Sequence, residues 1–212
     1  MLDLEFSNVG CYTPNGKIKA MTKDEKEKGI SAIAEQISLC KKCRLYEQAL
    51  HSVPGDGSCN TEITFVGEAP GFYEDQQGIP FVGRAGKLLE FMLKQIGYKR
   101  EEVWIGNIIK HRPPENRDPL PDEISACQDY LNHQLEIISP ILVVTLGRFS
   151  MNHFLPDAKI SVDHGKVQKA DKFTIYPLYH PAAGLRNPQV KKNLLIDFLR
   201  IPEILENVKN GH

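Results

Sequence analysis

The sequence lacks the features that would assign it to a membrane, to a secretory route or to a strongly basic class. No apolar run reaches the roughly 18 residues that a membrane-spanning helix needs, so we expect no membrane segment. The N-terminal stretch MLDLEFSNVG is too acidic and too briefly apolar for a signal peptide, and we therefore expect a cytoplasmic protein. The formal net charge is −1, so no overall basic field indicates a nucleic-acid partner, although a local basic strip would be enough to bind one.

Two glycine-rich nucleotide-binding motifs are also missing. The chain has neither G-x-G-x-x-G nor G-x-x-x-x-G-K-[ST], which disfavours a Rossmann-type cofactor site and a P-loop. What is present is an ordinary globular composition, with 212 residues of which 41% are hydrophobic and 25% charged. That length and composition fit one α/β domain with a sizeable core.

The number of cysteines, five, is odd, which disfavours a secreted disulfide framework. Cys40 and Cys43 form a C-x-x-C motif, which indicates either metal ligands or a redox pair. A redox pair is expected just after a strand, at the start of a helix. Here the motif closes a helical stretch, residues 26–39, so the spacing favours metal. Two ordinary thiols remain an alternative, because one C-x-x-C motif is a weak signal.

Apolar runs alternate with amphipathic stretches along the chain. Near-continuous apolar strands separated by helices predict a parallel sheet that is covered on both faces. We therefore expect an α/β fold, a three-layer α/β/α sandwich with a central, mostly parallel four-stranded sheet. Residues 1–25 are predicted to form a weakly structured extension, and residues 26–212 a single domain. The expected strands are residues 62–67, 102–107, 141–147 and 173–180; the expected helices are residues 26–39, 84–96, 122–138, 148–154 and 189–207.

Polar residues follow three of these strands. Glu68 comes directly after the first strand, Asn107 closes the second and His180 closes the fourth. Each one alone has an ordinary interpretation, as a solvated carboxylate, a turn cap or a satisfied loop histidine. Ligands in open α/β sheets bind beyond the carboxyl ends of the strands, where these three residues are expected to meet. The long loop that begins GEAPGFYEDQQGIPFVG supports a binding site at this edge.

Several segments together resemble one enzyme family. GEAPGFYEDQQGIPFVGRAGKLL, NIIKHRPPENRDP and HPAAGLRN look like the three active-site segments of family 4 uracil-DNA glycosylases, the iron–sulfur branch of that superfamily. CKKCRL and ACQDYL resemble the segments that hold the family's cluster. The similarity extends over about residues 36–200, with five motifs in the family's order. It implies hydrolysis of the bond between uracil and its sugar in DNA, and hence a role in DNA repair.

The resemblance gives three residues a direct role on the base. Phe81 is expected to stack on the flipped uracil, since an aromatic face stabilises a base without reading sequence. Asn107 is expected to bind the N3–H and O4 edge and to reject cytosine. His180 resembles the family histidine that donates a hydrogen bond to O2 as charge develops on the departing uracil.

The loop after the first strand supplies the other positions that the resemblance implies. Gly67, Ala69 and Gly71 are expected to line the substrate site, with backbone N–H groups around Glu68 and Ala69. Other families carry aspartate or asparagine at the position of Ala69 to orient the water. The catalytic carboxylate here is therefore predicted to be Glu68 or Glu74, and the sequence leaves both open.

DNA contacts are expected from a small set of side chains. Leu185 and Arg186 resemble the family loop that enters the minor groove and fills the space left by the flipped base. Arg112 and Lys110, together with Arg117 and Lys191, are expected to contact phosphates, which position a protein without specifying sequence. Ordinary solvated charges are the alternative interpretation. We expect a monomer that binds uracil-containing DNA, double- or single-stranded.

The metal site departs from the family pattern at one position. The resemblance implies a 4Fe-4S cluster held by Cys40, Cys43, His111 and Cys127, although family members usually have cysteine in place of His111. Zinc is equally compatible with three cysteines and one histidine, and only the resemblance favours iron. Cys59 or Cys11 is an alternative fourth ligand.

Two alternatives to a standard uracil-DNA glycosylase remain, and a third is disfavoured. His111 also resembles a ligand of uracil-DNA cross-linking relatives, but their inserted basic loop with a nucleophilic histidine is absent, so we predict no covalent trapping. A catalytically silent uracil-DNA-binding protein and a glycosylase for another deaminated base, such as hypoxanthine, stay open.

Overall fold

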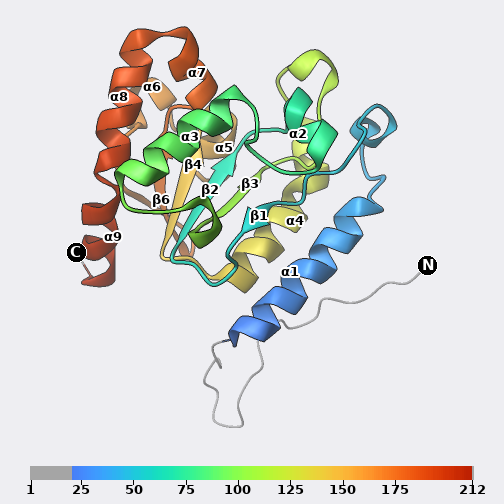
Figure 1. The fold of residues 1–212 in the computed structure, drawn as a ribbon, viewed down its shortest axis with the longest axis horizontal. Coiled ribbons are helices and arrows are strands. Elements are labelled where there is room, and N and C mark those ends of the chain that lie inside the picture. Colours follow the sequence, from blue (N-terminus) through green and yellow to red (C-terminus); the bar gives the residue numbers. More distant parts are fainter. Residues whose placement is uncertain (1–20, 212) are drawn as a thin grey trace.

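A six-stranded sheet forms the centre of the computed structural model, which describes residues 21–211 (Figure 1). The strand order is β1-β3-β2-β4-β6-β5, and β3, β2, β4 and β6 are mutually parallel. The mostly parallel sheet is confirmed, but the predicted number of four strands is wrong, because β1 and β5 add antiparallel edges. The strands are β1 Asp56–Gly57, β2 Ile63–Gly67, β3 Trp104–Asn107, β4 Leu142–Leu146, β5 Gln168–Ala170 and β6 Phe173–Leu178.

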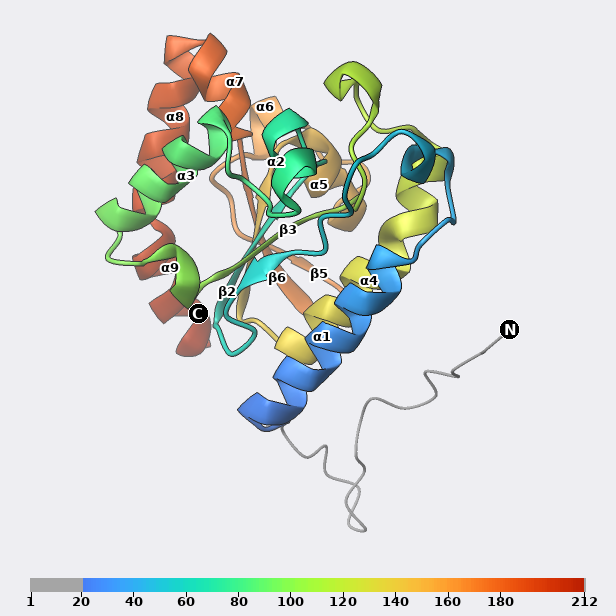
Figure 2. The same cartoon turned by 45° about the vertical axis from the view of Figure 1, so that its right-hand side comes forward.

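Helices cover both faces of the sheet, as Figures 1 and 2 show. One layer contains α3, α8 and α9; the other contains α1 and α4. Shorter helices lie near the carboxyl ends of the strands. The helices are α1 Lys23–Ser38, α2 Phe72–Gln77, α3 Arg84–Gln95, α4 Pro121–Ile138, α5 Arg148–Phe154, α6 Ile160–Asp163, α7 Pro181–Arg186, α8 Pro188–Leu199 and α9 Ile201–Lys209, with 3-10 turns at Arg44–Glu47, Arg100–Glu102 and Pro114–Asn116.

The central strands are apolar along their whole length because both faces are covered. Phe65 of β2 packs toward α8, where its ring stacks on Phe198 at 5.6 Å between centroids. The next residue, Val66, points to the opposite layer and shares a cluster with Leu131 and Leu135 of α4. This alternation fixes which side chains reach which layer, and it leaves the strand ends to present polar groups.

Several helix boundaries differ from the prediction. Helix α1 begins at Lys23, because Thr22 accepts a hydrogen bond from Glu25 N and Glu25 caps Thr22 N in return. The predicted extension therefore ends earlier than residue 25, and its residues 1–20 lie outside the described part. The predicted final helix is two helices. Pro202 fits the first turn of α9 but not the interior of a continuous helix, so the chain breaks at Arg200.

Two short helices occupy segments that we predicted to be loops. Helix α2 lies within the long connection after β2, and α7 directly follows His180. Both have only six residues, too short for an apolar period to be visible in the sequence.

The carboxyl ends of the strands meet at one edge, as predicted. Gly67 is the register partner of Asn107, and Leu146 is the partner of Leu178. Glu68 and His180, which follow these strands, therefore lie at the same edge as Asn107.

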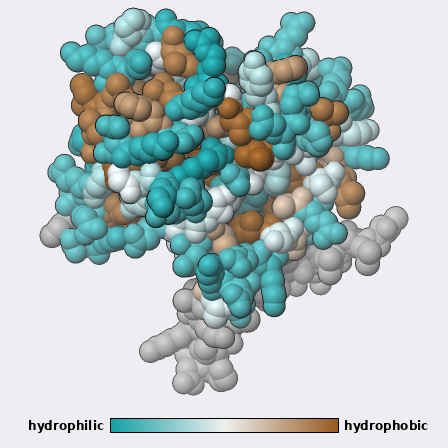
Figure 3. Space-filling view, in the orientation of Figure 1, coloured by the Kyte–Doolittle hydropathy of each residue, from teal (hydrophilic) through white to brown (hydrophobic). Residues whose placement is uncertain are grey.

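The surface carries apolar patches between hydrophilic regions. On the face shown in Figure 3, brown residues gather beside α3 and α8. The exposed apolar side chains of these two helices include Phe91, Ile196 and Leu199. Within residues 21–211, no helix is both long enough and apolar enough to cross a membrane.

Close packing between α3 and the preceding loop depends on one glycine. A Cβ at Gly86 would overlap the backbone carbonyl of Phe81. Phe81 itself has a φ of 53°, a left-handed conformation that costs free energy in a residue with a side chain. Gly86 therefore allows the loop to hold Phe81 in this conformation against the helix.

We predict that Gly86→Ala destabilises the protein by about 1–3 kcal/mol, the range typical of overpacking, despite the higher helix propensity of alanine. Urea unfolding followed by circular dichroism measures the change. Gly29→Ala is the matched control, because Gly29 is also helical and its added Cβ would meet only the flexible side chain of Ile137. Equal or higher stability of Gly86→Ala would contradict the packing argument.

Candidate active site

A cavity of about 380 Å³ opens at the carboxyl edge of the sheet. We call it the strand-end cavity. It brings together residues from the ends of β2, β3 and β6, from α2 and α7, and from the loop that precedes α4. The lining residues are Glu68, Ala69, Pro70, Gly71, Glu74, Phe81, Ala85, Asn107, Pro113, Asn116, Arg117, Asp118, Pro119, His180, Ala182 and Arg186.

Asn107 presents an unsatisfied amide in this cavity. Its side chain is 1% exposed, and Oδ1 has no hydrogen-bond partner among the described residues. A buried polar atom without a partner is costly, so such an atom in a cavity indicates a binding group. The neighbouring Gly67 leaves room for this amide, because a Cβ there would overlap both Asn107 Oδ1 and the ring of Phe81.

Phe81 forms an aromatic wall of the cavity. It is 6% exposed, and its ring lies 5.6 Å from the His180 ring with an interplanar angle of 27°. Arg100 holds the backbone of this strained residue, donating to Phe81 O at 3.2 Å and to Pro80 O. Asp56 of β1 in turn binds Arg100 Nε at 3.2 Å. The unpredicted edge strand thus supports the position of Phe81 through one ion pair.

His180 is held as a neutral hydrogen-bond donor. The Ala182 N–H donates to His180 Nδ1 at 3.1 Å, which makes Nδ1 an acceptor and places the ring proton on Nε2. Burial, with a smaller contribution from the Arg186 charge, lowers the pKa of His180 to about 4. The ring is therefore uncharged at neutral pH.

Glu68 is a carboxylate with a raised pKa. Its Oε1 accepts a hydrogen bond from the Phe149 N–H at 3.0 Å, at the start of α5. Burial raises the pKa of Glu68 to about 6, although this backbone hydrogen bond acts in the opposite direction. A carboxyl group with such a pKa is ionised at neutral pH and remains basic enough to accept a proton or to orient water.

Glu74, the other candidate carboxylate, holds the loop together. Its Oε2 accepts from Gly71 N at 3.1 Å, and its Oε1 accepts from Val82 N and Gly83 N, both at 2.9 Å. Both oxygens are thus used to connect the start of α2 with the start of α3. The geometry favours Glu68 for chemistry and Glu74 for the shape of the cavity.

The predicted DNA-contacting residues separate into two groups. Arg186 lines the cavity and Leu185, 38% exposed, lies beside it at the end of α7. Lys110 is fully buried and donates to Asn107 O at 2.9 Å and to Gln134 Oε1 at 2.8 Å. The predicted contact of Lys110 with a DNA phosphate is therefore wrong in this structure: its ammonium group supports the backbone below Asn107.

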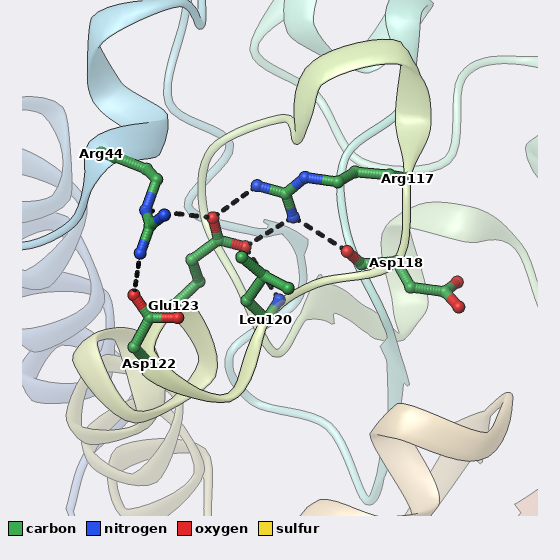
Figure 4. Close-up of polar contacts among 6 residues, drawn as sticks. All are labelled: Arg44, Arg117, Asp118, Leu120, Asp122 and Glu123. Atoms are coloured by element: carbon green, nitrogen blue, oxygen red, sulfur yellow. Dashed lines mark hydrogen bonds and ion pairs between the residues drawn. The ribbon is translucent and has the colours of Figure 1, made fainter.

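Arg117 is also engaged within the protein, as Figure 4 shows. It donates to both oxygens of Glu123, at 2.9 and 2.6 Å, and Glu123 is completely buried. On the other side of Glu123 lies Arg44, which also pairs with Asp122. This network connects the C-x-x-C segment, the loop that lines the cavity and the start of α4.

The predicted metal ligands come from three segments, the C-x-x-C motif, α4 and the loop after β3. The Cys43 thiol hydrogen-bonds with Cys127, and this contact lowers the pKa of Cys43 to about 6. Cys40 contacts Tyr130, one turn beyond Cys127 on α4, and shares a small cavity with His111. In the described part of the chain, no three His, Cys, Asp or Glu side chains are arranged to hold a single metal ion. The ligand set therefore stays a prediction.

The alternative ligand Cys59 lies elsewhere. Glu27, Lys26 and Lys23, at the start of α1, are the charges that act on its thiol. Cys40 follows the other end of this 16-residue helix, about 24 Å away along its axis. Cys59 is thus too distant from Cys40 to bind the same cluster. Cys11 lies outside the described residues.

Arg100 and the polar cavity residues Asn116 and Asp118 were not predicted from the sequence. The loop rich in proline and charge, residues 112–123, was the available signal for the latter two. Arg100 carried no comparable signal, because it acts on backbone carbonyls nineteen and twenty residues away.

Comparisons with known proteins identify the family of the chain. A family model described as the uracil DNA glycosylase superfamily matches residues 54–200. The chain is 45% identical to the type-4 uracil-DNA glycosylase of Sulfurisphaera tokodaii, over 82% of this chain and 84% of that protein. It is 47% identical to the type-4 uracil-DNA glycosylase of Archaeoglobus fulgidus, over 81% of this chain and 91% of that protein. A DNA polymerase of Bacillus phage SP01 is 32% identical over 72% of this chain and 17% of its own length. The chain therefore belongs to the uracil-DNA glycosylase superfamily, with type-4 members among its relatives.

Proposed function

We propose that this protein is a uracil-DNA glycosylase of type 4, a DNA repair enzyme that flips uracil out of DNA, hydrolyses its N-glycosidic bond and leaves an abasic site. The observation that carries the proposal is the buried amide of Asn107, whose Oδ1 lacks a partner among the described residues of the strand-end cavity. Uracil offers N3–H as a donor for this oxygen and O4 as an acceptor for the amide N–H. Cytosine has no N3–H and carries an amine at position 4, so it leaves the buried amide mismatched.

The base is bound before the reaction by stacking and by the shape of the cavity. Phe81 offers its face to the flipped base, and Gly67 keeps the space between Phe81 and Asn107 open. Because Arg100 and Gly86 fix the backbone of Phe81, this wall exists before substrate binds. Such preorganisation avoids an ordering cost during binding.

The bond between uracil N1 and the sugar C1′ breaks with its electron pair staying on the base. Negative charge then develops on O2, and His180 donates its Nε2–H to that oxygen. A neutral imidazole suits this role, since its proton is held in place by the fixed tautomer and stabilises the oxygen without being transferred.

Water completes the reaction by adding to the sugar carbon. Glu68 orients this water and accepts its proton, because its carboxylate is ionised at neutral pH and lines the cavity. Glu74 shapes the loop instead. On the DNA side, Leu185 and Arg186 enter the duplex to fill the space of the flipped base, from the end of α7.

We further propose a 4Fe-4S cluster with Cys40, Cys43, His111 and Cys127 as its ligands. The contact between Cys43 and Cys127 and the shared cavity of Cys40 and His111 fit this set, and thiolate and imidazole are suitable iron ligands. When bound, the cluster cross-links the C-x-x-C segment, α4 and the loop after β3.

The direct test of the proposed function is the release of free base from oligonucleotides that contain uracil, hypoxanthine or xanthine. We predict that the wild-type protein releases uracil and that Asn107→Ala slows single-turnover excision by at least about tenfold, which corresponds to about 1.4 kcal/mol. Asn193→Ala, an asparagine on α8 outside the cavity, is the control. If no base were released, the protein would be a catalytically silent binding protein. If hypoxanthine were released preferentially, hypoxanthine and not uracil would be the substrate.

We also predict that excision depends on pH through Glu68. The pKa of this carboxyl is raised to about 6, so the active carboxylate is present above that pH and is lost as the pH falls through it. The single-turnover rate should therefore decline below about pH 6, approaching about tenfold per pH unit. His180, with a pKa of about 4, stays neutral over most of this range. The same decline in a Glu68→Gln variant would assign the titration to another group.

If the cluster is present, we predict that the purified protein is brown, absorbs broadly at about 400 nm and contains roughly four iron atoms per chain. His111→Cys should retain the iron, because thiolate is the commoner ligand, whereas His111→Ala should lose iron. Elemental analysis measures both, with Cys59→Ala as a control that retains iron because Cys59 lies at the other end of α1. Full iron content in His111→Ala would exclude His111 as a ligand, and zinc in place of iron would exclude the cluster.

A further inference from the structure

Two aromatic side chains are exposed on α2, a helix that contributes residues to the strand-end cavity. Phe72 is 49% exposed and Tyr73 is 56% exposed. Their rings lie 5.4 Å apart at an angle of 84°, and we call them the α2 aromatic pair. Gly71 and Glu74, on either side of the pair in sequence, both line the cavity. The pair therefore belongs to a helix that borders the cavity.

The guanidinium group of Arg112 lies over one ring of this pair. The guanidinium carbon of Arg112 lies 5.1 Å from the centroid of the Phe72 ring. Arg112 Nε donates to Asn116 Oδ1 at 2.8 Å, and Asn116 lines the cavity. The two terminal nitrogens of Arg112 have no hydrogen bond or ion pair within residues 21–211. A planar cation is thus held between an aromatic ring and the cavity rim with donors available to a ligand.

The other side of the cavity carries the end of α7. Arg186 and Ala182 of this helix line the cavity, and α2 and α7 lie at the same edge of the sheet in both Figures 1 and 2. A nucleotide whose base enters the cavity is covalently joined to a neighbour on each side. The DNA strand must therefore leave the cavity across its rim, where exposed rings and a cation match the faces of bases and the charge of phosphates.

We propose that Phe72, Tyr73 and Arg112 bind the DNA strand next to the flipped nucleotide. An aromatic ring of the α2 aromatic pair stacks on the adjacent base, and Arg112 contacts the phosphate beside it. This inference rests on the proposed function, because it needs a flipped nucleotide in the cavity. It adds a site for a neighbouring nucleotide, and it explains why two large rings are exposed beside the cavity.

The test uses binding rather than excision. The full-length protein is titrated into a labelled single-stranded oligonucleotide with one tetrahydrofuran abasic analogue, which no glycosylase can cleave, and fluorescence anisotropy gives Kd. We expect Phe72→Ala combined with Tyr73→Ala to weaken binding by at least about tenfold. The conservative pair Phe72→Tyr and Tyr73→Phe should bind like wild type. Phe91→Ala is the matched control, since Phe91 is 51% exposed but belongs to α3.

Two further measurements separate stacking from charge. With 2-aminopurine placed beside the abasic analogue, wild-type protein should quench its fluorescence by stacking, and the alanine pair should not. Arg112→Ala should reduce the slope of log K against log salt by about 0.7, the value for one phosphate contact on a single strand. An unchanged slope would remove Arg112 from the site.

Other outcomes would overturn the inference. Wild-type binding by the alanine pair, or an equal loss in Phe91→Ala, would show that the pair contacts no DNA. A change of oligomeric state in the alanine pair, measured by sedimentation, without a change in DNA binding would assign the surface to a second copy of the chain. If the wild-type protein released no uracil, the proposed function would fail on that assay, whereas the binding measurements would still report on the aromatic pair.

Discussion

The placement of Phe81 is the constraint on which the rest of the site depends. Its ring contacts the His180 ring and the end of β2, and the absence of side chains at Gly67 and Gly86 leaves room for its ring and its backbone. The conformation is strained, with φ at 53°, and the surrounding structure has to hold it. Arg100 does so by binding the carbonyl of Phe81, and Asp56 at the edge of the sheet holds Arg100. A short edge strand, a glycine in α3 and an aromatic wall thus form one unit.

The polar side chains for which we propose a role on the base and the water differ in charge, and two of them are uncharged in the cavity. Asn107 is neutral by nature, and burial keeps His180 neutral by lowering its pKa to about 4. Burial acts in the other direction on the carboxyl of Glu68 and raises its pKa to about 6. In the proposed reaction, burial would therefore provide both a neutral donor for the departing base and a basic carboxylate for the water. Because these groups are already fixed in the structure, the stabilisation of developing charge that we propose for them would need little reorganisation.

The sequence predicted the parallel strands and the polar residues at their ends because both follow from simple rules. Buried strands are continuous apolar runs, and parallel strands end at one edge, which placed Glu68, Asn107 and His180 together. Lys110 was misassigned because the sequence of a polar loop does not show whether a basic side chain points to solvent or into the protein. Its ammonium group donates to Asn107 O and to Gln134. The edge strands were missed because β1 has two residues and β5 has three, too few for a visible period. Arg100 was missed because the carbonyls of Pro80 and Phe81 that it binds are backbone groups, which any sequence provides.

The central claim is that, in the free protein, His180 is a neutral imidazole with its proton on Nε2. Nitrogen-15 NMR of histidine-labelled protein, with His180→Asn to assign the signal, tests it directly between about pH 5 and 8. We predict one nitrogen-15 chemical shift typical of a protonated Nε2 and one typical of an unprotonated Nδ1. Neither should change with pH over this range, since the pKa of His180 is about 4. Titration near the ordinary histidine value, or shifts for a proton on Nδ1, would contradict it.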